Sequence, residues 1–182
     1  MKKILLTTTL LSIVTSQLLA VDFIKGNYYG GVGFGIEKFS RYSSYDPGAN
    51  IVLNGGKPII KLGPGMIGAE GEFTYTVLPL NYSRYSSDFD LSIITLGAYA
   101  TYTFEHSDKL YTRAKLGIVN RNYSWDYNGN SYGYDYDYNK VGVGAGFGAG
   151  YKFGDKLRIY SDLILLDGSD LTQLNFGVQM NF

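Results

Sequence analysis

The chain has 182 residues, 16 basic and 16 acidic side chains and a formal net charge of zero, so nothing in its charge points to nucleic acid as a partner. Cysteine is absent, which excludes a disulfide framework and a thiolate metal site. The chain is long enough for one domain, and its 18 tyrosines and 24 glycines are high counts.

Residues 1–20 have the layout of a secretory signal peptide. Two lysines follow the first methionine, 4–14 is apolar apart from threonines and one serine, and Ala20 is the small residue before the expected cleavage. The apolar stretch is shorter than the roughly 20 residues that span a membrane, which argues against an anchor. We therefore expect 21–182 to form a secreted domain, either a soluble all-β protein or a membrane barrel.

Apolar and polar residues then alternate with a period of two, which predicts β-strands. The predicted strands are 27–39, 57–63, 67–77, 89–104, 110–122, 140–153, 157–166 and 173–182. Pro58 interrupts the second of them, because proline cannot donate a ladder hydrogen bond. In the sixth, glycines from Gly142 to Gly150 alternate with apolar residues, so one face is apolar and the other is nearly bare.

The connections between these strands alternate between short and long. Short turns are expected near Gly63, Ser107 and Asp155, and long loops at 41–56, 78–88, 123–139 and 167–170. This alternation is typical of small membrane barrels, whose short turns face the periplasm and whose long loops face outward. The predicted fold is therefore an all-β, eight-stranded antiparallel up-and-down transmembrane β-barrel over residues 21–182.

The polar faces of the strands carry many charges, which a dry lipocalin-type ligand cavity would not accept. The expected lumen charges are Glu37, Lys57, Lys61, Glu70, Glu72, Arg113, Lys115, Lys152, Arg158 and Asp162. We expect Glu70 and Glu72 to pair with the two lysines of the adjacent strand, with Arg113, Lys115 and Arg158 reaching across. A barrel of eight strands is just wide enough for side chains, so the lumen is predicted to be plugged.

Aromatic residues lie at the outward positions near the predicted periplasmic ends of the strands. A common height on several strands predicts a girdle at the lipid–water boundary rather than ordinary core packing. The expected girdle residues are Tyr28, Tyr102, Phe104, Tyr151, Phe153 and Phe182. The last strand alternates up to a terminal aromatic, as expected of a closing strand whose edge is paired.

The alternating run from Val141 to Phe153, the turn 154–157 and the C-terminal strand together resemble the OmpA/OmpX-type outer membrane protein beta-barrel domain. The resemblance implies residence in the lipid of a Gram-negative outer membrane. It also implies contact with the barrel-assembly machinery during biogenesis, through a C-terminal signal. The matching signal residues are Asn175, Gly177, Met180 and Phe182, with Met180 in place of the usual aromatic.

No catalytic, cofactor or metal site is expected. The one histidine, His106, falls in a predicted periplasmic turn, the wrong end for an enzyme that acts on outer-leaflet lipid. The tyrosine-rich loops have the composition of adaptable recognition surfaces, although alternating Tyr and Asp could also continue the flanking strands as a hairpin. Candidates for recognition of an extracellular ligand are Tyr123, Trp125, Tyr134 and Tyr136.

Two functions remain open from the sequence. The first is a barrel that serves envelope structure or surface interaction and adhesion. The alternative is a narrow, gated, porin-like channel for ions or small solutes, which would open by rearrangement of the lumen charges.

Overall fold

The computed structural model describes residues 22–23, 26, 28–39, 45–84, 87–127, 136–168 and 170–182. Nearly all of them lie in strands, and no helix in these stretches is long and apolar enough to cross a membrane. The strands are β1 (Asp22–Phe23), β2 (Tyr29–Phe39), β3 (Gly48–Leu62), β4 (Gly65–Leu78), β5 (Leu80–Arg84), β6 (Ser87–Glu105), β7 (Leu110–Tyr127), β8 (Tyr136–Phe153), β9 (Leu157–Leu166) and β10 (Leu171–Asn181).

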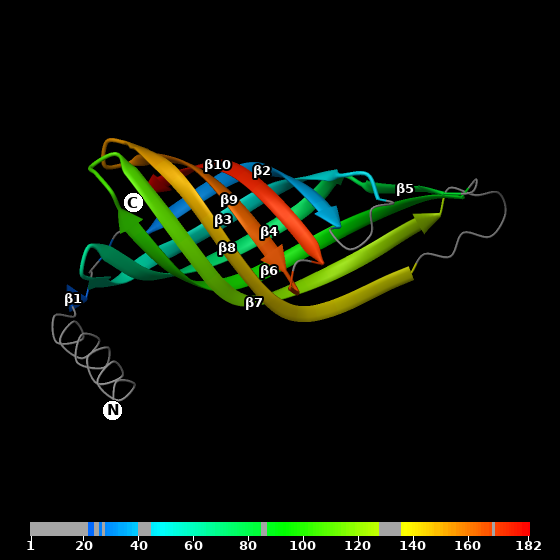
Figure 1. The fold of residues 1–182 in the computed structure, drawn as a ribbon, viewed down its shortest axis with the longest axis horizontal. Coiled ribbons are helices and arrows are strands. Elements are labelled where there is room, and N and C mark those ends of the chain that lie inside the picture. Colours follow the sequence, from blue (N-terminus) through cyan, green and yellow to red (C-terminus); the bar gives the residue numbers. More distant parts are fainter. Residues whose placement is uncertain are drawn as a thin grey trace, which may run out of the picture.

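Eight of these strands close into a barrel (Figure 1). Neighbours in the chain pair antiparallel, and β10 closes the ring on β2 from Leu171 opposite Phe39 to Asn181 opposite Tyr29. The two short strands lie outside the ring: β1 pairs with β3, and β5 pairs with β6. The predicted eight-stranded antiparallel up-and-down barrel is therefore confirmed.

The barrel has two different ends, named here the turn end and the loop end. The turn end carries β1, the C-terminus and the tight turns that follow β3, β6 and β8. Gly63 and Gly154 occupy left-handed positions in two of these turns, with φ of 57° and 71°, which glycine adopts without strain. At the loop end β5, β7 and β8 project well beyond β2, β9 and β10 (Figure 1).

Several predicted loops are shorter than expected because strand pairing continues through them. The expected loop 41–56 is already strand from Gly48, and β5 lies inside the expected loop 78–88. Likewise β7 continues to Tyr127 and β8 starts at Tyr136, with Tyr123 opposite Tyr138. The alternating aromatic and polar residues of 123–127 and 136–139 therefore continue the hairpin, as period-two patterning favours.

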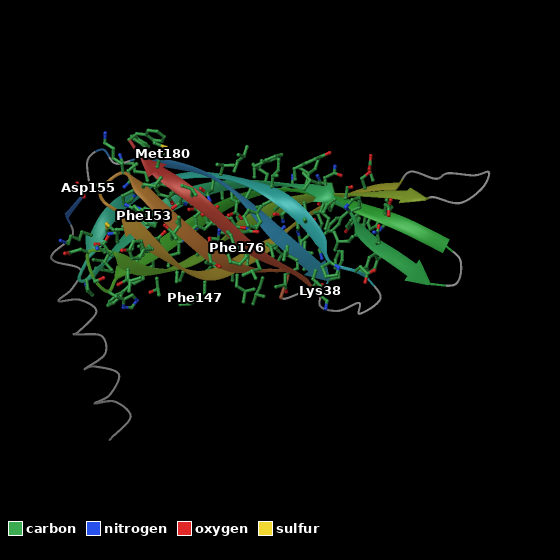
Figure 2. The ribbon with its side chains drawn as sticks, turned by 90° about the horizontal axis from the view of Figure 1, so that it is seen from above. Lys38, Phe147, Phe153, Asp155, Phe176 and Met180 are labelled. Atoms are coloured by element: carbon green, nitrogen blue, oxygen red, sulfur yellow. The ribbon has the colours of Figure 1, made fainter. Side chains whose placement is uncertain are left out.

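The two faces of the barrel are inverted relative to a soluble protein. Large apolar side chains point outward: Leu96 is 60% exposed, Phe147 is 62% exposed and Val141 is 64% exposed. Figure 2 shows side chains covering the outside, with Phe153 and Met180 near the turn end and Lys38 toward the other end. Polar side chains such as Glu72, Asn175 and Gln173 are buried inside. This is the pattern of a barrel that faces lipid.

Candidate functional site

The glycines of β8 make room for large side chains inside the barrel. A Cβ at Gly148 would collide with the carboxylate of Asp162, and one at Gly146 would lie 3.0 Å from Cγ of Lys115. A Cβ at Gly150 would collide with the ring of Tyr111. Because side chains alternate along a strand, these glycines form one inward face that clears space for the lumen.

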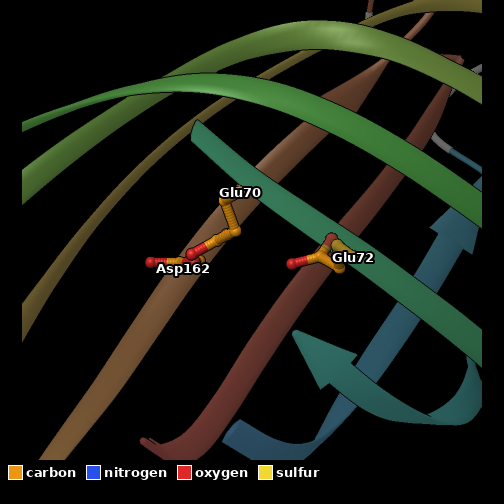
Figure 3. Close-up of side chains that lie close together, drawn as sticks. All are labelled: Glu70, Glu72 and Asp162. Carbon is orange, nitrogen blue, oxygen red and sulfur yellow. The ribbon is translucent and has the colours of Figure 1, made fainter. Parts of the chain in front are cut away.

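A cluster of five charged side chains, here called the central network, fills the middle of the lumen. It comprises Glu70, Glu72, Arg113, Lys115 and Asp162, none of them more than 4% exposed. Figure 3 shows the three carboxylates converging from β4 and β9. Arg113 donates from Nε to Asp162 Oδ1 at 2.8 Å and from Nη1 to Glu70 Oε2 at 2.9 Å, and its Nη2 also reaches Asp162.

Lys115 lies at the centre of the three carboxylates. Its Nζ is 2.6 Å from Glu72 Oε2, 3.3 Å from Glu70 Oε1 and 3.2 Å from Asp162 Oδ2. The carboxylate oxygens lie within 4.8 Å of one another, close enough for a metal ion, but the ammonium group already contacts all three. Lys115 thus occupies the position in which a bound cation would sit.

Tyrosines surround the central network. The Tyr29 hydroxyl donates to Glu70 Oε2 at 2.7 Å, Arg113 lies 4.6 Å from the ring centroid of Tyr160, and Lys115 lies 4.9 Å from that of Tyr99. These contacts supply donors and aromatic faces to charges that have lost water. Alternation in the sequence places Tyr99 and Tyr160 on inward faces, but sequence reasoning named none of these tyrosines as a partner of the lumen charges.

The prediction that Lys57 and Lys61 pair with Glu70 and Glu72 is wrong. Lys57 continues the alternation of Ile51 and Leu53 along β3, so it is opposite Ala69 on the outer face, with its ammonium 4.8 Å from the ring centroid of Tyr28. A β-bulge between Pro58 and Ile60 follows it and shifts the register of the rest of β3 against β4. Lys61 is exposed at the end of β3, opposite Met66. The partners of the two glutamates come from β7 instead.

The three remaining predicted lumen charges lie away from the central network. Glu37 is fully buried and accepts hydrogen bonds from Thr76 Oγ1, from Asn50 Nδ2 at 3.3 Å and from Gln173 Nε2 at 3.1 Å. These donors are neutral. Lys152 forms an ion pair with Glu105, and the guanidinium of Arg158 lies 5.9 Å from the ring centroid of Tyr111.

An apolar cluster fills the loop end of the lumen. Its largest fully buried members, Leu80, Leu91, Ile93, Ile164, Leu166 and Leu171, are 0% exposed and come from β5, β6, β9 and β10. Tyr99 and Val119 also belong to the cluster and form its boundary with the polar part of the lumen. A packed apolar layer of this kind excludes water and ions from the barrel axis.

Beyond the apolar cluster lies a cavity of about 230 Å³, here called the loop-end pocket. Its walls are aromatic, and Leu91 belongs to both the pocket and the apolar cluster beneath it. The aromatic lining consists of Phe39, Tyr45, Tyr123, Trp125 and Tyr138. The ring of Tyr123 stacks on Trp125, Tyr138 and Phe39 at centroid distances of 5.8, 6.3 and 6.3 Å.

Charged residues complete the loop-end pocket. Arg121 and Lys140 line it, together with Asp170, and both cations bond to Asp167, Lys140 Nζ at 2.6 Å from Oδ2. Partial burial would raise the pKa of Asp167, but hydrogen bonds from Lys140 and Arg121 and their positive charges outweigh it and lower the pKa. Arg121 is 1% exposed, yet its Nε has no hydrogen-bond partner among the described residues.

Two of the four predicted recognition residues, Tyr123 and Trp125, line the loop-end pocket. Tyr136 pairs through its backbone with Trp125, but its side chain lies outside the described residues, as does all of Tyr134. Sequence reasoning missed Tyr138, Lys140 and Asp167 as part of this site. Only the cross-strand register, with Arg121 opposite Lys140, brings them together.

The turn end holds the predicted girdle and the C-terminal signal residues. Tyr28, Phe153 and Phe182 are exposed, whereas Tyr102, Phe104 and Tyr151 are half-buried. Of the signal residues, Asn175 is buried in the lumen, Gly177 lies beside the Tyr160 ring, Met180 is exposed, and the Phe182 N–H donates to the Tyr28 carbonyl at 2.8 Å. His106 lies in the turn and contacts Thr112 at 2.9 Å.

A cavity of about 600 Å³ also opens at the turn end, lined by Glu105, Lys152, Arg158 and residues of the turns. It is separated from the loop-end pocket by the central network and the apolar cluster. The two mouths of the barrel are therefore not joined by an open path through the described residues.

Comparisons with known proteins agree with this architecture. The family model described as "Outer membrane protein beta-barrel domain" matches residues 6–182. A search of curated protein sequences finds no match.

Solved structures with the same fold share little sequence with this chain. Ail, the attachment invasion locus protein of Yersinia pestis, solved with the heparin analogue sucrose octasulfate, has a TM-score of 0.59 at 14% identity, covering 87% of this chain and 100% of that one. Neisserial surface protein A has a TM-score of 0.57 at 16% identity, covering 87% and 98%. The N-terminal barrel of Pseudomonas aeruginosa OprF has a TM-score of 0.56 at 16% identity, covering 86% and 98%.

Proposed function

Because the chain belongs to the outer membrane protein beta-barrel domain family, which places it in the outer membrane, we propose that it is a closed barrel that supports the envelope and makes surface contacts through its loop end. The observation that carries the proposal is the filled lumen. A salt-bridged network and an apolar cluster lie in series along its axis, while a pocket stays open above them.

This arrangement favours a surface role over the alternative of a gated channel. Rearranging the central network alone would not open a path, because Leu91, Ile93 and Leu171 would still close the loop end. Ion passage through an apolar constriction needs that layer to move apart as well. The work of opening would therefore include separating a packed core, which a closed structural barrel never has to do.

The orientation, biogenesis and lack of catalysis form part of the same proposal. We place the loop end outside the cell and the turn end in the periplasm, with 1–20 removed as a signal peptide. Asn175, Gly177, Met180 and Phe182 would be read by the barrel-assembly machinery, and the outward aromatic residues would contact lipid headgroups. The barrel would not be an enzyme, since His106 lies in a turn at the opposite end from the loop-end pocket.

The names of two structural relatives fit a surface role. One is an attachment invasion locus protein and one is a surface protein, although their identity to this chain is too low to carry more than the fold. The proposal therefore depends on the lumen and the pocket of this chain.

Planar-bilayer recording tests the closed lumen. The refolded wild-type barrel is expected to show no discrete conductance steps, beside a general porin as positive control. Cells that display the barrel are expected to adhere to a target surface more than cells whose barrel has 128–135 replaced by a short glycine–serine turn. Discrete openings in wild type, or equal adhesion of both strains on every surface offered, would refute the respective halves of the proposal.

A further inference from the structure

We propose that the loop-end pocket binds a single saccharide ring of neutral or balanced charge, stacked on its aromatic wall and held by the Nε–H of Arg121. The inference rests on the proposed surface role and names its ligand class. Three features of the pocket carry it: its aromatic lining, its charge balance and one unsatisfied buried donor.

The aromatic wall provides flat faces with polar edges. Tyr123 is held by stacking on both Phe39 and Trp125, so its ring is fixed before any ligand arrives. Tyrosine and tryptophan are suited to a site that is apolar on one side and wet on the other. The C–H face of a saccharide ring matches such a wall, while its hydroxyl groups match the polar edge.

The charges of the pocket argue against a polyanion. Arg121 and Lys140 are both bonded to Asp167, and Asp170 adds a second negative charge to the lining. Among the residues that the structure describes, two cations and two carboxylates leave no net positive charge in the pocket to attract a sulfated or phosphorylated chain. Balanced charged groups can still hydrogen-bond hydroxyl and amide groups.

The Nε–H of Arg121 supplies the specific contact. A buried donor without an acceptor is costly, and in a cavity it indicates a missing partner. Nη2 of the same guanidinium bonds to Asp167, which restrains the position of Nε. A ring oxygen or hydroxyl in the pocket would satisfy this donor. The volume of about 230 Å³ is below the range typical of drug-sized ligands, so the pocket suits one ring rather than a chain.

The fluorescence of Trp125 can report binding, because Trp125 is the one tryptophan of the chain and lines the pocket. The full barrel, in a detergent whose headgroup is not a sugar, would be titrated separately with glucose, galactose, mannose and N-acetylglucosamine. At least one is expected to shift Trp125 emission with a saturating curve. Heparin is expected to have no effect at physiological ionic strength.

Two variants and a matched control locate the site. Tyr138→Ala is expected to weaken binding of the responding saccharide about three- to tenfold through lost stacking. Arg121→Lys keeps the positive charge beside Asp167 but lacks Nε, and is expected to weaken binding about tenfold. Tyr75→Ala is the control, because Tyr75 and Tyr138 are both 45% exposed but only Tyr138 lines the pocket.

The outcomes separate this inference from the proposed surface role. No response to any saccharide, while cells displaying the barrel still adhere, would overturn the ligand class and leave the surface role standing. Tight heparin binding would overturn the charge argument. Equal affinity of Arg121→Lys and wild type would overturn the donor assignment, since water would then be the partner of Nε. If the wild-type barrel gave neither adhesion nor a response to any saccharide, both proposals would be refuted.

Discussion

At the scale of single residues, the central network is held by two cations that each serve more than one carboxylate. Arg113 contacts Glu70 and Asp162, and Lys115 contacts these two and Glu72. Three carboxylates thus face two cations in a nearly dry interior. Removing a cation is therefore expected to lower the stability of the barrel more than removing an acid.

Arg113→Gln is expected to lower the free energy of unfolding by about 3–5 kcal/mol, because two buried carboxylates lose their main partner. Glu72→Gln is expected to cost less, about 1–2 kcal/mol, since it leaves two acids beside two cations and the amide can still accept from Lys115. Urea unfolding in lipid vesicles, followed by Trp125 fluorescence, measures both. A larger loss in Glu72→Gln than in Arg113→Gln would contradict the assigned pairing.

Asp167 is expected to make stability depend on pH in acid. Its pKa is lowered in the folded barrel, so its contribution is present above the ordinary aspartate value of about 3.9 and is lost as pH falls through the lower folded value. Asp167→Asn suits the test, because the residue has φ of 49° and asparagine tolerates this conformation. The difference in unfolding free energy from wild type should be constant between pH 5 and about 8 and shrink below about pH 4. A difference that grows in acid would contradict the ion pairs.

At the scale of elements, strand ends and irregularities decide which side chains enter the lumen. In β3, alternation places Lys57 on the outer face, and the bulge after Pro58 reverses the faces only for the residues that follow it. In β8, the glycines of the inward face leave room for side chains from β7 and β9.

Gly148→Ala is expected to destabilise the barrel by about 1–3 kcal/mol, because its Cβ would overlap the Asp162 carboxylate and the Ser161 carbonyl. Gly71→Ala is the matched control within a strand, since the nearest atom to its Cβ would be the Gly55 carbonyl at 3.9 Å. The control is expected to stay within about 0.5 kcal/mol of wild type in the same urea assay. Equal losses in the two variants would mean that lumen space is not limiting.

Deletion of Phe182 is expected to reduce the amount of assembled barrel in the outer membrane. The residue extends the pairing of β10 with β2, because its N–H donates to the Tyr28 carbonyl. Its ring lies over Gly30, where an added Cβ would be in van der Waals contact with it. Quantitative immunoblotting of heat-modifiable protein in membrane fractions measures the effect. Phe153→Ala is the control, because it removes an exposed aromatic at the same end and leaves the hydrogen bond from Phe182 to Tyr28 in place. Equal levels in the deletion and the control would contradict a specific role in assembly.

At the scale of the whole molecule, ring closure pairs β2 with β10, so the backbone groups at the two ends of the sheet bond to each other. The ladder from β2 through β10 returns to β2, and the apolar side chains face outward along it. Such a barrel is stable only where lipid or detergent covers that surface.

The refolded protein is therefore expected to resist SDS and to migrate differently on gels with and without boiling. Circular dichroism of the unboiled sample should show β-structure. A monomer that stays in solution without detergent, or a helical spectrum, would contradict a lipid-facing exterior.

The sequence by itself determined the fold class, the inward and outward faces of most strands and the short turns, because each depends on a local signal: a period of two, an aromatic at a strand end, or a glycine in a turn. The identity of Arg113, Lys115 and Asp162 as inward residues also follows from alternation. Only the tertiary structure decided which charges meet, since pairing depends on register between strands. The Pro58 bulge depends on the register of β3 against β4. The partners of Glu70 and the meeting of Arg121 with Asp167 beside Tyr123 depend on distances within the closed ring, which no local pattern encodes.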